Sequence, residues 1–123
     1  MQDFHQLNVW KKAHNLVLRV DTASNNLPPS ENFGLVPHLR RSAIVIARTI
    51  AEGCGRGSDA EFAVDLRKAR AAGYELKYIL LLCRDLGFLT VAAHDQLNDE
   101  QVEVRKMISG LISRVLAAPL PLP

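Results

Sequence analysis

The sequence predicts an all-α protein, folded as one antiparallel four-helix bundle in up-down-up-down order, and three observations predict it. Apolar residues make up 48% of the 123 residues and charged residues 23%, a balance typical of a globular domain with a buried core. Aromatic residues are only 6% while Ala and Leu are plentiful, which favours helix over sheet. Four long stretches repeat apolar residues every three or four positions, and short turn-forming segments separate them. We therefore expect one domain over residues 1–123, with a loose Pro-rich tail at 118–123.

The first helix is expected from about Asn8 to Ala23. Asn8 is the expected N-cap, because its side chain can accept a hydrogen bond from an unpaired first-turn N–H. The Asn-Asn-Leu-Pro-Pro segment at 25–29 should end the helix. The apolar residues of the helix form one stripe, made of Leu7, Trp10, Ala13, Leu16, Val17 and Val20.

The second helix is expected from about Leu35 to Ala51, with Pro37 in the first turn, where a missing N–H is tolerated. Apolar residues surround most of this helix. We expect one four-helix core to leave part of them uncovered, as an apolar face of roughly several hundred Å² that is typical of an interface. A glycine cluster at 53–57 follows, and we expect it to end the helix in the left-handed conformation that glycine accepts.

The third helix has the clearest start signal, because Ser58 followed by Glu61 and an apolar run is a capping box. The apolar pattern continues to Leu86, and Gly87 should end the helix. Gly73, in its middle, lowers helix propensity by about 1 kcal/mol relative to Ala. This cost predicts a packing reason for a small residue there.

The fourth helix is expected after Thr90, which should cap it. Its buried stripe alternates steps of four and three residues, the heptad spacing. The stripe consists of Leu97, Gln101, Val104, Ile108, Leu111 and Val115. The opposite face should be a solvated polar ladder, made of Asp95, Asp99, Glu103 and Lys106.

Residues 39–43, Leu-Arg-Arg-Ser-Ala, and 50–56, Ile-Ala-Glu-Gly-Cys-Gly-Arg, carry a resemblance that extends over about residues 4–116. The chain resembles the bacterial four-helix-bundle family encoded within intervening sequences of 23S ribosomal RNA genes, many of whose members have no assigned activity. The resemblance implies a ring-shaped homopentamer. It also implies kinship with accessory proteins of diversity-generating retroelements, which bind nucleic acid beside a reverse transcriptase. Where the family usually has Ser-Ile-Pro-Ser-Asn, this chain has Val-Ile-Ala-Arg-Thr at 45–49, so we expect a straighter second helix.

The third helix carries a candidate nucleic-acid site, a basic ridge about 20 Å long at helical rise. Its residues recur mostly every seven positions and are Arg67, Arg70, Lys77 and Arg84. Such a ridge can follow a nucleic-acid backbone, and the net charge of +2 permits this without requiring it. A solvated helix face is the alternative, because nearby carboxylates dilute the charge. Tyr74 and Tyr78 are the only nearby aromatic residues, so little base stacking is expected.

A second candidate set, centred on the second helix, suits an assembly interface or ion-pair network better than phosphate contact, because its neighbours are apolar. The set consists of Arg40, Arg41, Arg48, Glu52, Arg56 and Glu75. Arg48 and Glu52 lie four residues apart and can form a helical ion pair.

No catalytic, metal or cofactor site is predicted. Cys54 and Cys83 lack Cys-x-x-Cys spacing, and the four histidines are scattered. The glycine cluster has neither P-loop nor dinucleotide-binding spacing. The polar N-terminus is unlike a signal peptide, and no apolar run approaches the ~20 residues that span a membrane, so a cytoplasmic protein is expected.

These observations predict a non-enzymatic, self-assembling protein, a homo-oligomer whose second partner is RNA or DNA. Two alternatives stay open. One is a protein-binding scaffold without nucleic-acid contact, and the more remote one is an uncharacterised enzyme.

Overall fold

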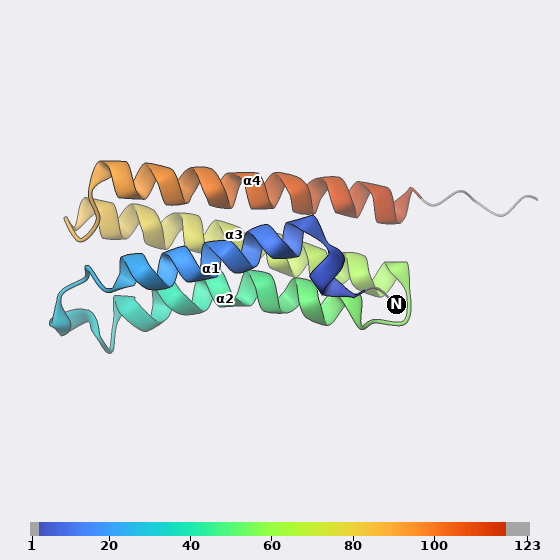
Figure 1. Cartoon of the computed structure of the whole chain (residues 1–123), viewed down its shortest axis with the longest axis horizontal. Helices are drawn as coiled ribbons and strands as arrows, with labels where there is room; N and C mark the ends of the chain where they lie inside the picture. The colour runs from blue at the N-terminus through green and yellow to red at the C-terminus, as the bar shows by residue number, and fades with distance from the viewer. Residues whose placement is uncertain (1–2, 118–123) are drawn as a thin grey trace, which may run out of the picture.

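Four long helices form the part of the chain that the computed structural model describes, residues 3–117 (Figure 1). They are α1 (Asn8–Ser24), α2 (Leu35–Cys54), α3 (Asp59–Asp85) and α4 (Val91–Leu116), with short 3-10 turns at η1 (Phe4–Gln6) and η2 (Pro29–Glu31). No strand occurs within residues 3–117, so the all-α prediction is confirmed for them. The predicted loose tail at 118–123 lies outside the described residues.

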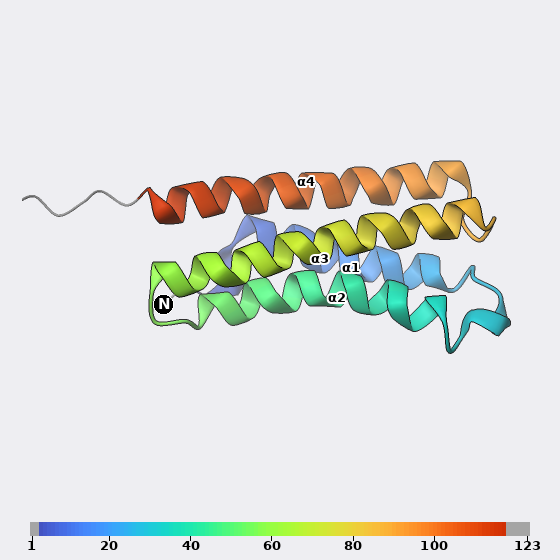
Figure 2. The same cartoon turned by 180° about the vertical axis from the view of Figure 1, so that it is seen from behind.

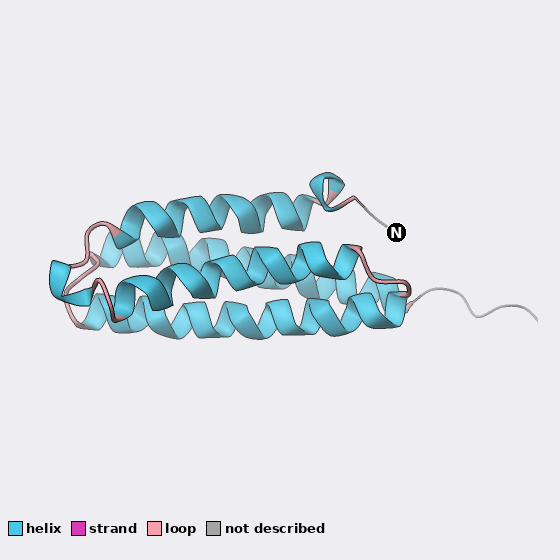
Figure 3. Cartoon of the chain, turned by 90° about the horizontal axis from the view of Figure 1, so that it is seen from below, coloured by secondary structure: helices cyan, strands magenta, loops and turns pink. Residues whose placement is uncertain are grey.

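The helices lie side by side along one axis, and short loops join them (Figures 1 and 3). Each helix packs against its neighbours in sequence, and α1 also packs against α4. The α1–α2 and α3–α4 connections lie at one end of the molecule, and the α2–α3 connection lies at the other, as Figure 2 also shows. This arrangement surrounds one central core.

The core is built from the apolar stripes of all four helices, as the sequence predicts. The largest fully buried apolar side chains are Leu16, Leu39, Ile46, Ile50, Leu66, Leu76, Leu80 and Ile108. Each such side chain contributes about 1.5–3 kcal/mol by leaving water. The polar Gln101 lies in the same core and is 0% exposed, so its amide must find partners inside the protein.

Three helix ends follow the local sequence signals. The Ser58 hydroxyl oxygen accepts a hydrogen bond from the Glu61 N–H at 3.2 Å, and the Thr90 hydroxyl oxygen accepts one from the Ala93 N–H at 3.1 Å. At the end of α3, Gly87 has a φ of 80°, a left-handed conformation that glycine adopts without strain.

The start of α1 differs from the prediction. Asn8 is the first residue of the helix, and Leu7 holds the N-cap position with an extended backbone and no side-chain cap hydrogen bond. The prediction of Asn8 as the cap is therefore wrong. The η1 turn sets the direction of the chain here, and Leu7 packs against the core.

The end of α2 also differs. The helix continues through Gly53 to Cys54, and the following Gly55 has a right-handed φ of −88°, so the predicted left-handed stop is wrong. Gly53 is needed for space instead. A Cβ atom there would lie 2.8 Å from Cδ1 of Phe62 and 3.1 Å from Cβ of Asp65, which shows that α2 and α3 approach closely at this point.

The apolar circumference of α2 is covered more completely than expected. Ile44, with 46% of its surface exposed, is the large apolar side chain of α2 that is most open to solvent. It shares the outer face with Arg41, Arg48 and Glu52 at steps of three and four residues. The expected broad apolar face is thus reduced to one side chain among charges, because α1 and α3 both pack against α2.

Candidate functional site

The exposed face of α3 carries cations and aromatic rings together. Steps of three and four residues place Arg67, Arg70, Tyr74, Tyr78 and Leu81 on one side of the helix. The Tyr74 side chain is 55% exposed and Tyr78 is 62% exposed. The sequence alone predicts little stacking capacity, whereas the structure shows two accessible rings interleaved with arginines. We name these residues and Lys77, with the neighbouring side chains of α4 described below, the α3–α4 face.

Arg105 of α4 completes this face. The carbon of its guanidinium lies 4.1 Å from the centre of the Tyr74 ring, a cation–π contact. Its Nε donates to Oε1 of buried Gln101 at 2.7 Å. Nε2 of Gln101 in turn donates to Oδ1 of Asn98 at 2.7 Å. The buried amide therefore finds its partners, and it holds Arg105 over Tyr74.

Gly73 provides the space for Arg105. A Cβ atom on Gly73 would lie 2.7 Å from Cγ and 2.9 Å from Cδ of Arg105. The packing reason that the sequence predicts for this glycine is therefore present. The neighbour is the aliphatic part of an arginine, which can bury its stem while its charge stays at the surface.

A groove of about 250 Å³ opens between α3 and α4 beside the tyrosine rings. His94, at its α4 side, is buried, and its Nδ1 lies within hydrogen-bond distance, 2.8 Å, of Oδ1 of Asp95. Rings and an aliphatic side chain form most of the groove, and an ammonium group and an amide add polar contacts. The lining residues are Tyr74, Lys77, Tyr78, Leu81, His94 and Asn98.

The four residues of the predicted basic ridge differ in how free their charges are. Nη1 of Arg70 donates to Oγ of Ser109 at 3.2 Å, which ties Arg70 to α4. Nε and Nη2 of Arg84 contact the same carboxylate oxygen of Asp85 at 3.1 and 3.0 Å. Arg67 and Lys77 are exposed, and neither forms an ion pair within residues 3–117. These two cations are the most available for a ligand.

The structure does not bring the second candidate set together at one place. Arg40 is tied to the end of α1, where its Nε lies 2.8 Å from Oγ of Ser24 and 3.1 Å from Oδ1 of Asp21. Arg48 and Glu52 form the ion pair that their spacing predicts, at 3.4 Å. This pair is about half exposed on both sides, so it contributes little to stability.

None of the other members of that set joins this ion pair. Arg41 on α2 and Glu75 on α3 are both exposed. Arg56 lies beyond α2, and its Nε donates to Oδ2 of Asp65 at 2.7 Å. The Asp65 side chain is only 3% exposed, and its hydrogen bond raises the pKa of Arg56. Sequence reasoning missed this pair, which joins the α2–α3 connection to α3.

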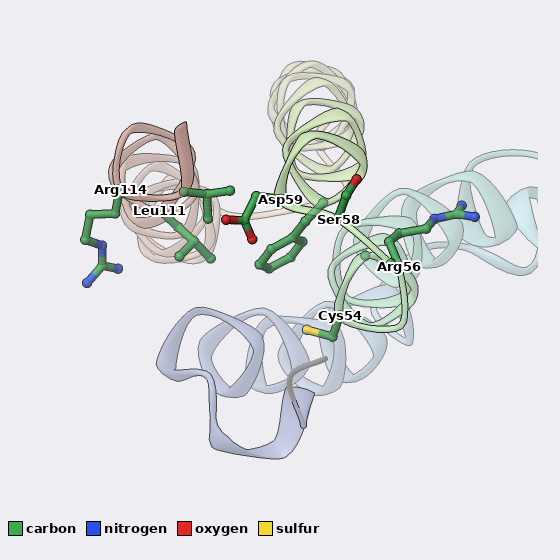
Figure 4. Close-up of a pocket in the computed structure, with 10 residues that line it drawn as sticks. Cys54, Arg56, Ser58, Asp59, Leu111 and Arg114 are labelled. Carbon is green, nitrogen blue, oxygen red and sulfur yellow. The ribbon is translucent and has the colours of Figure 1, made fainter. Parts of the chain in front are cut away.

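A second pocket, of about 330 Å³, lies at the α2–α3 connection (Figure 4). Figure 4 shows the Asp59 carboxylate beside Leu111 at the pocket, whereas Arg56 and Arg114 point outward on opposite sides. Both arginines line the pocket, but the Asp59 carboxylate lines it as well and would repel a phosphate there. This geometry favours a structural role for the glycine cluster at 53–57, as the turn between α2 and α3.

Cys54 and Cys83 are free and buried, and burial raises the pKa of both thiols. A protonated, buried thiol is a poor nucleophile. Within residues 3–117, no group of three or more His, Cys, Asp or Glu side chains is placed to hold a metal ion. None of the described helices has the length and apolar character needed to cross a lipid bilayer.

The match to known families is decisive. Residues 5–110 match the family described as 23S rRNA-intervening sequence protein. The chain belongs to this family. The family resemblance carried by residues 39–43 and 50–56 is thereby confirmed.

A solved structure shows the same fold for a protein of the S23 ribosomal protein family. The crystal structure of that protein, of unknown function, from Bacteroides thetaiotaomicron VPI-5482, superimposes with a TM-score of 0.79. The two sequences are 23% identical, and the match covers 85% of this chain and 97% of the other. No curated protein matches the chain.

In this member of the 23S rRNA-intervening sequence protein family, the sequence did not point to the α4 half of the α3–α4 face. Asn98, Gln101, Arg105 and Ser109 follow one another at steps of three and four residues. That spacing was the available signal. The heptad stripe of α4, to which Gln101 also belongs, predicts only the buried side of the helix.

Proposed function

We propose that this protein is a non-enzymatic accessory protein that binds RNA or DNA through the α3–α4 face. The observation that carries the proposal is the interleaving of exposed Tyr74 and Tyr78 with Arg67, Arg70 and Lys77. Cations that neutralise phosphates and rings that stack on bases are the two components of sequence-tolerant nucleic-acid binding. The kinship with retroelement accessory proteins, which the family resemblance implies, supports the same role.

A protein-binding scaffold is the second candidate. Phe33, at the α1–α2 connection, is 100% exposed, and an exposed aromatic ring is a typical anchor for a protein partner. This residue stands apart in sequence from the α3–α4 face. A partner that uses Phe33 and leaves the cations of α3 uncovered would favour the scaffold role.

We also propose that copies of the chain assemble into a ring-shaped homo-oligomer, a pentamer, built from antiparallel up-down-up-down bundles. The connections at alternate ends of the molecule support the antiparallel order. The family resemblance supports the ring, and we assign Ile44, with Arg41 and Arg48 beside it, to the contact between copies.

The chain acts as a single domain in the cytoplasm, where its thiols stay reduced. Light scattering at micromolar concentration should give five times the chain mass of 13.6 kDa, and a mass of 13.6 kDa would reject assembly.

Fluorescence anisotropy with labelled ribosomal RNA fragments tests the binding proposal. Electrostatic affinity is greatest at low salt, so binding should be measurable at about 50 mM salt. The logarithm of the association constant should then fall linearly with the logarithm of the salt concentration. Absence of binding at about 50 mM salt to RNA and to single-stranded DNA would reject the nucleic-acid role. The scaffold would then be the better explanation of the exposed rings.

A further inference from the structure

We propose that the groove between α3 and α4 holds one unpaired nucleobase, so that the protein prefers single-stranded nucleic acid to duplex. This inference rests on the proposed function and specifies the form of nucleic acid that the α3–α4 face takes. Bases in a duplex are stacked on each other, and their faces are not available to a protein ring. A single strand can turn a base outward and stack it on an aromatic side chain.

Tyr78 is the ring that would receive the base. One face of Tyr74 is already covered by the guanidinium of Arg105, at 4.1 Å from the ring centre. Tyr78 is 62% exposed and lines the groove. Tyr74 and Arg105 therefore form a fixed wall, and Tyr78 supplies the open stacking surface.

The groove also offers polar contacts for the edge of a base. Asn98 lines it, and its Oδ1 accepts a hydrogen bond from Nε2 of Gln101. That bond orients the Asn98 amide so that its NH₂ group remains a donor. Gln101 is fully buried, so the amide is held by a fixed partner before any ligand arrives.

The charge of the surrounding surface fits the backbone on either side of that base. Lys77 lines the groove itself. Arg67 and Arg70 precede it on the same side of α3, so the cations extend over about 15 Å at helical rise. A strand with several phosphates in this distance would be held by all three cations, whereas a neutral or basic peptide would gain nothing from them.

Anisotropy with a labelled single strand of about 12 nucleotides, RNA or DNA, and with the duplex of the same sequence tests the inference. At one salt concentration, the single strand should bind about tenfold or more tightly than the duplex. Tyr78→Leu should weaken single-strand binding about tenfold, since one base–aromatic stack is lost, and should leave duplex binding unchanged. Tyr78→Phe should retain single-strand binding, because the ring remains.

Phe33→Leu is the matched control, since it removes an exposed aromatic ring outside the α3–α4 face, and it should change neither affinity. Circular dichroism should show that all three variants unfold like the wild type. Duplex binding as tight as single-strand binding, or a Tyr78→Leu variant with unchanged single-strand affinity, would overturn the inference and leave the proposed function standing. Failure of both forms of nucleic acid to bind would overturn both.

Discussion

The guanidinium of Arg105 lies over the Tyr74 ring, 4.1 Å from its centre, and the residue before Tyr74 is the glycine that leaves room for the arginine stem. This contact joins the middle of α4 to the middle of α3 at the surface. It fixes one wall of the groove that Tyr78 also lines. The α3–α4 face therefore has a defined shape before a ligand binds, which lowers the entropic cost of binding.

Replacement of Gly73 should reveal this packing. A glycine-to-alanine change inside a helix ordinarily stabilises by about 1 kcal/mol. In Gly73→Ala the new Cβ would meet Cγ of Arg105 at 2.7 Å, so we expect no gain, and a net loss of about 1 kcal/mol from the displaced side chain. Urea unfolding monitored by circular dichroism measures the difference.

Gly110 provides the matched control for Gly73. It lies inside α4, and no atom lies within 4 Å of a Cβ built on it. Gly110→Ala should therefore show the full stabilisation of about 1 kcal/mol. In an Arg105→Ala background, where the arginine stem is absent, Gly73→Ala should instead stabilise by about 1 kcal/mol. Equal gains in Gly73→Ala and Gly110→Ala would show that Arg105 does not occupy the space beside Gly73.

The ion pair between Arg56 and Asp65 should stabilise the α2–α3 connection. Asp65 is 3% exposed and Arg56 contacts it at 2.7 Å, while Nζ of Lys68 lies 3.9 Å away. Arg56→Gln would leave a buried carboxylate with a weaker partner, which is unfavourable. The midpoint of thermal unfolding should fall by several degrees.

The exposed pair of Arg48 and Glu52 serves as the comparison for this result. Its side chains are 55% and 52% exposed, so Arg48→Gln should change the midpoint by about 1 °C or less at protein concentrations where assembly is unchanged. Asp65→Asn, which removes the charge and keeps the shape, should be milder than Arg56→Gln. If Arg56→Gln and Arg48→Gln unfold at the same temperature, the buried pair has no special role.

The two thiols should be slow to react in the folded protein. Burial raises the pKa of Cys54 and Cys83, so the thiolate fraction at pH 8 is below that of an exposed thiol, and access is restricted as well. A thiol-specific disulfide reagent should modify the native chain at least roughly tenfold more slowly than the urea-unfolded chain. Cys54→Ala assigns the remaining reaction to Cys83. Rapid modification of either thiol in the folded chain would contradict its burial.

The parts of the fold that local chemistry determines could be predicted from the sequence. Ser58, Thr90 and Gly87 act through hydrogen bonds and backbone conformations within a few residues, and such signals are readable along the chain. The cap at Asn8 and the left-handed stop near Gly53 were predicted from the same kind of signal and were wrong. Packing from elsewhere, of Leu7 on the core and of Phe62 on Gly53, overrode the local preference.

The candidate site also combines features that local sequence reveals with features that depend on the packing of helices. Arg67, Arg70 and Lys77 share a face of one helix, which spacing alone reveals. The approach of Arg105 to Tyr74 depends on how α3 and α4 are aligned across 31 residues of sequence, and no local pattern encodes that alignment. The exposure of the tyrosines likewise depends on which side of α3 the other helices cover.

The salt dependence of nucleic-acid affinity in two charge-matched double variants tests the central claim most directly. Arg67→Gln/Lys77→Gln removes the two cations of the α3–α4 face that are most available for a ligand. Lys11→Gln/Arg114→Gln removes the same charge, one Lys and one Arg, from exposed positions elsewhere on α1 and α4. Each single-strand phosphate contact contributes about 0.7 to the slope of log affinity against log salt.

We predict that the magnitude of the slope falls by about 1.4 in the Arg67→Gln/Lys77→Gln variant, because two phosphate contacts are lost. The slope should stay at the wild-type value in the Lys11→Gln/Arg114→Gln variant. Thermal unfolding should first show that both variants are folded. A wild-type slope in the first variant, or an equal fall in both, would contradict binding through the α3–α4 face.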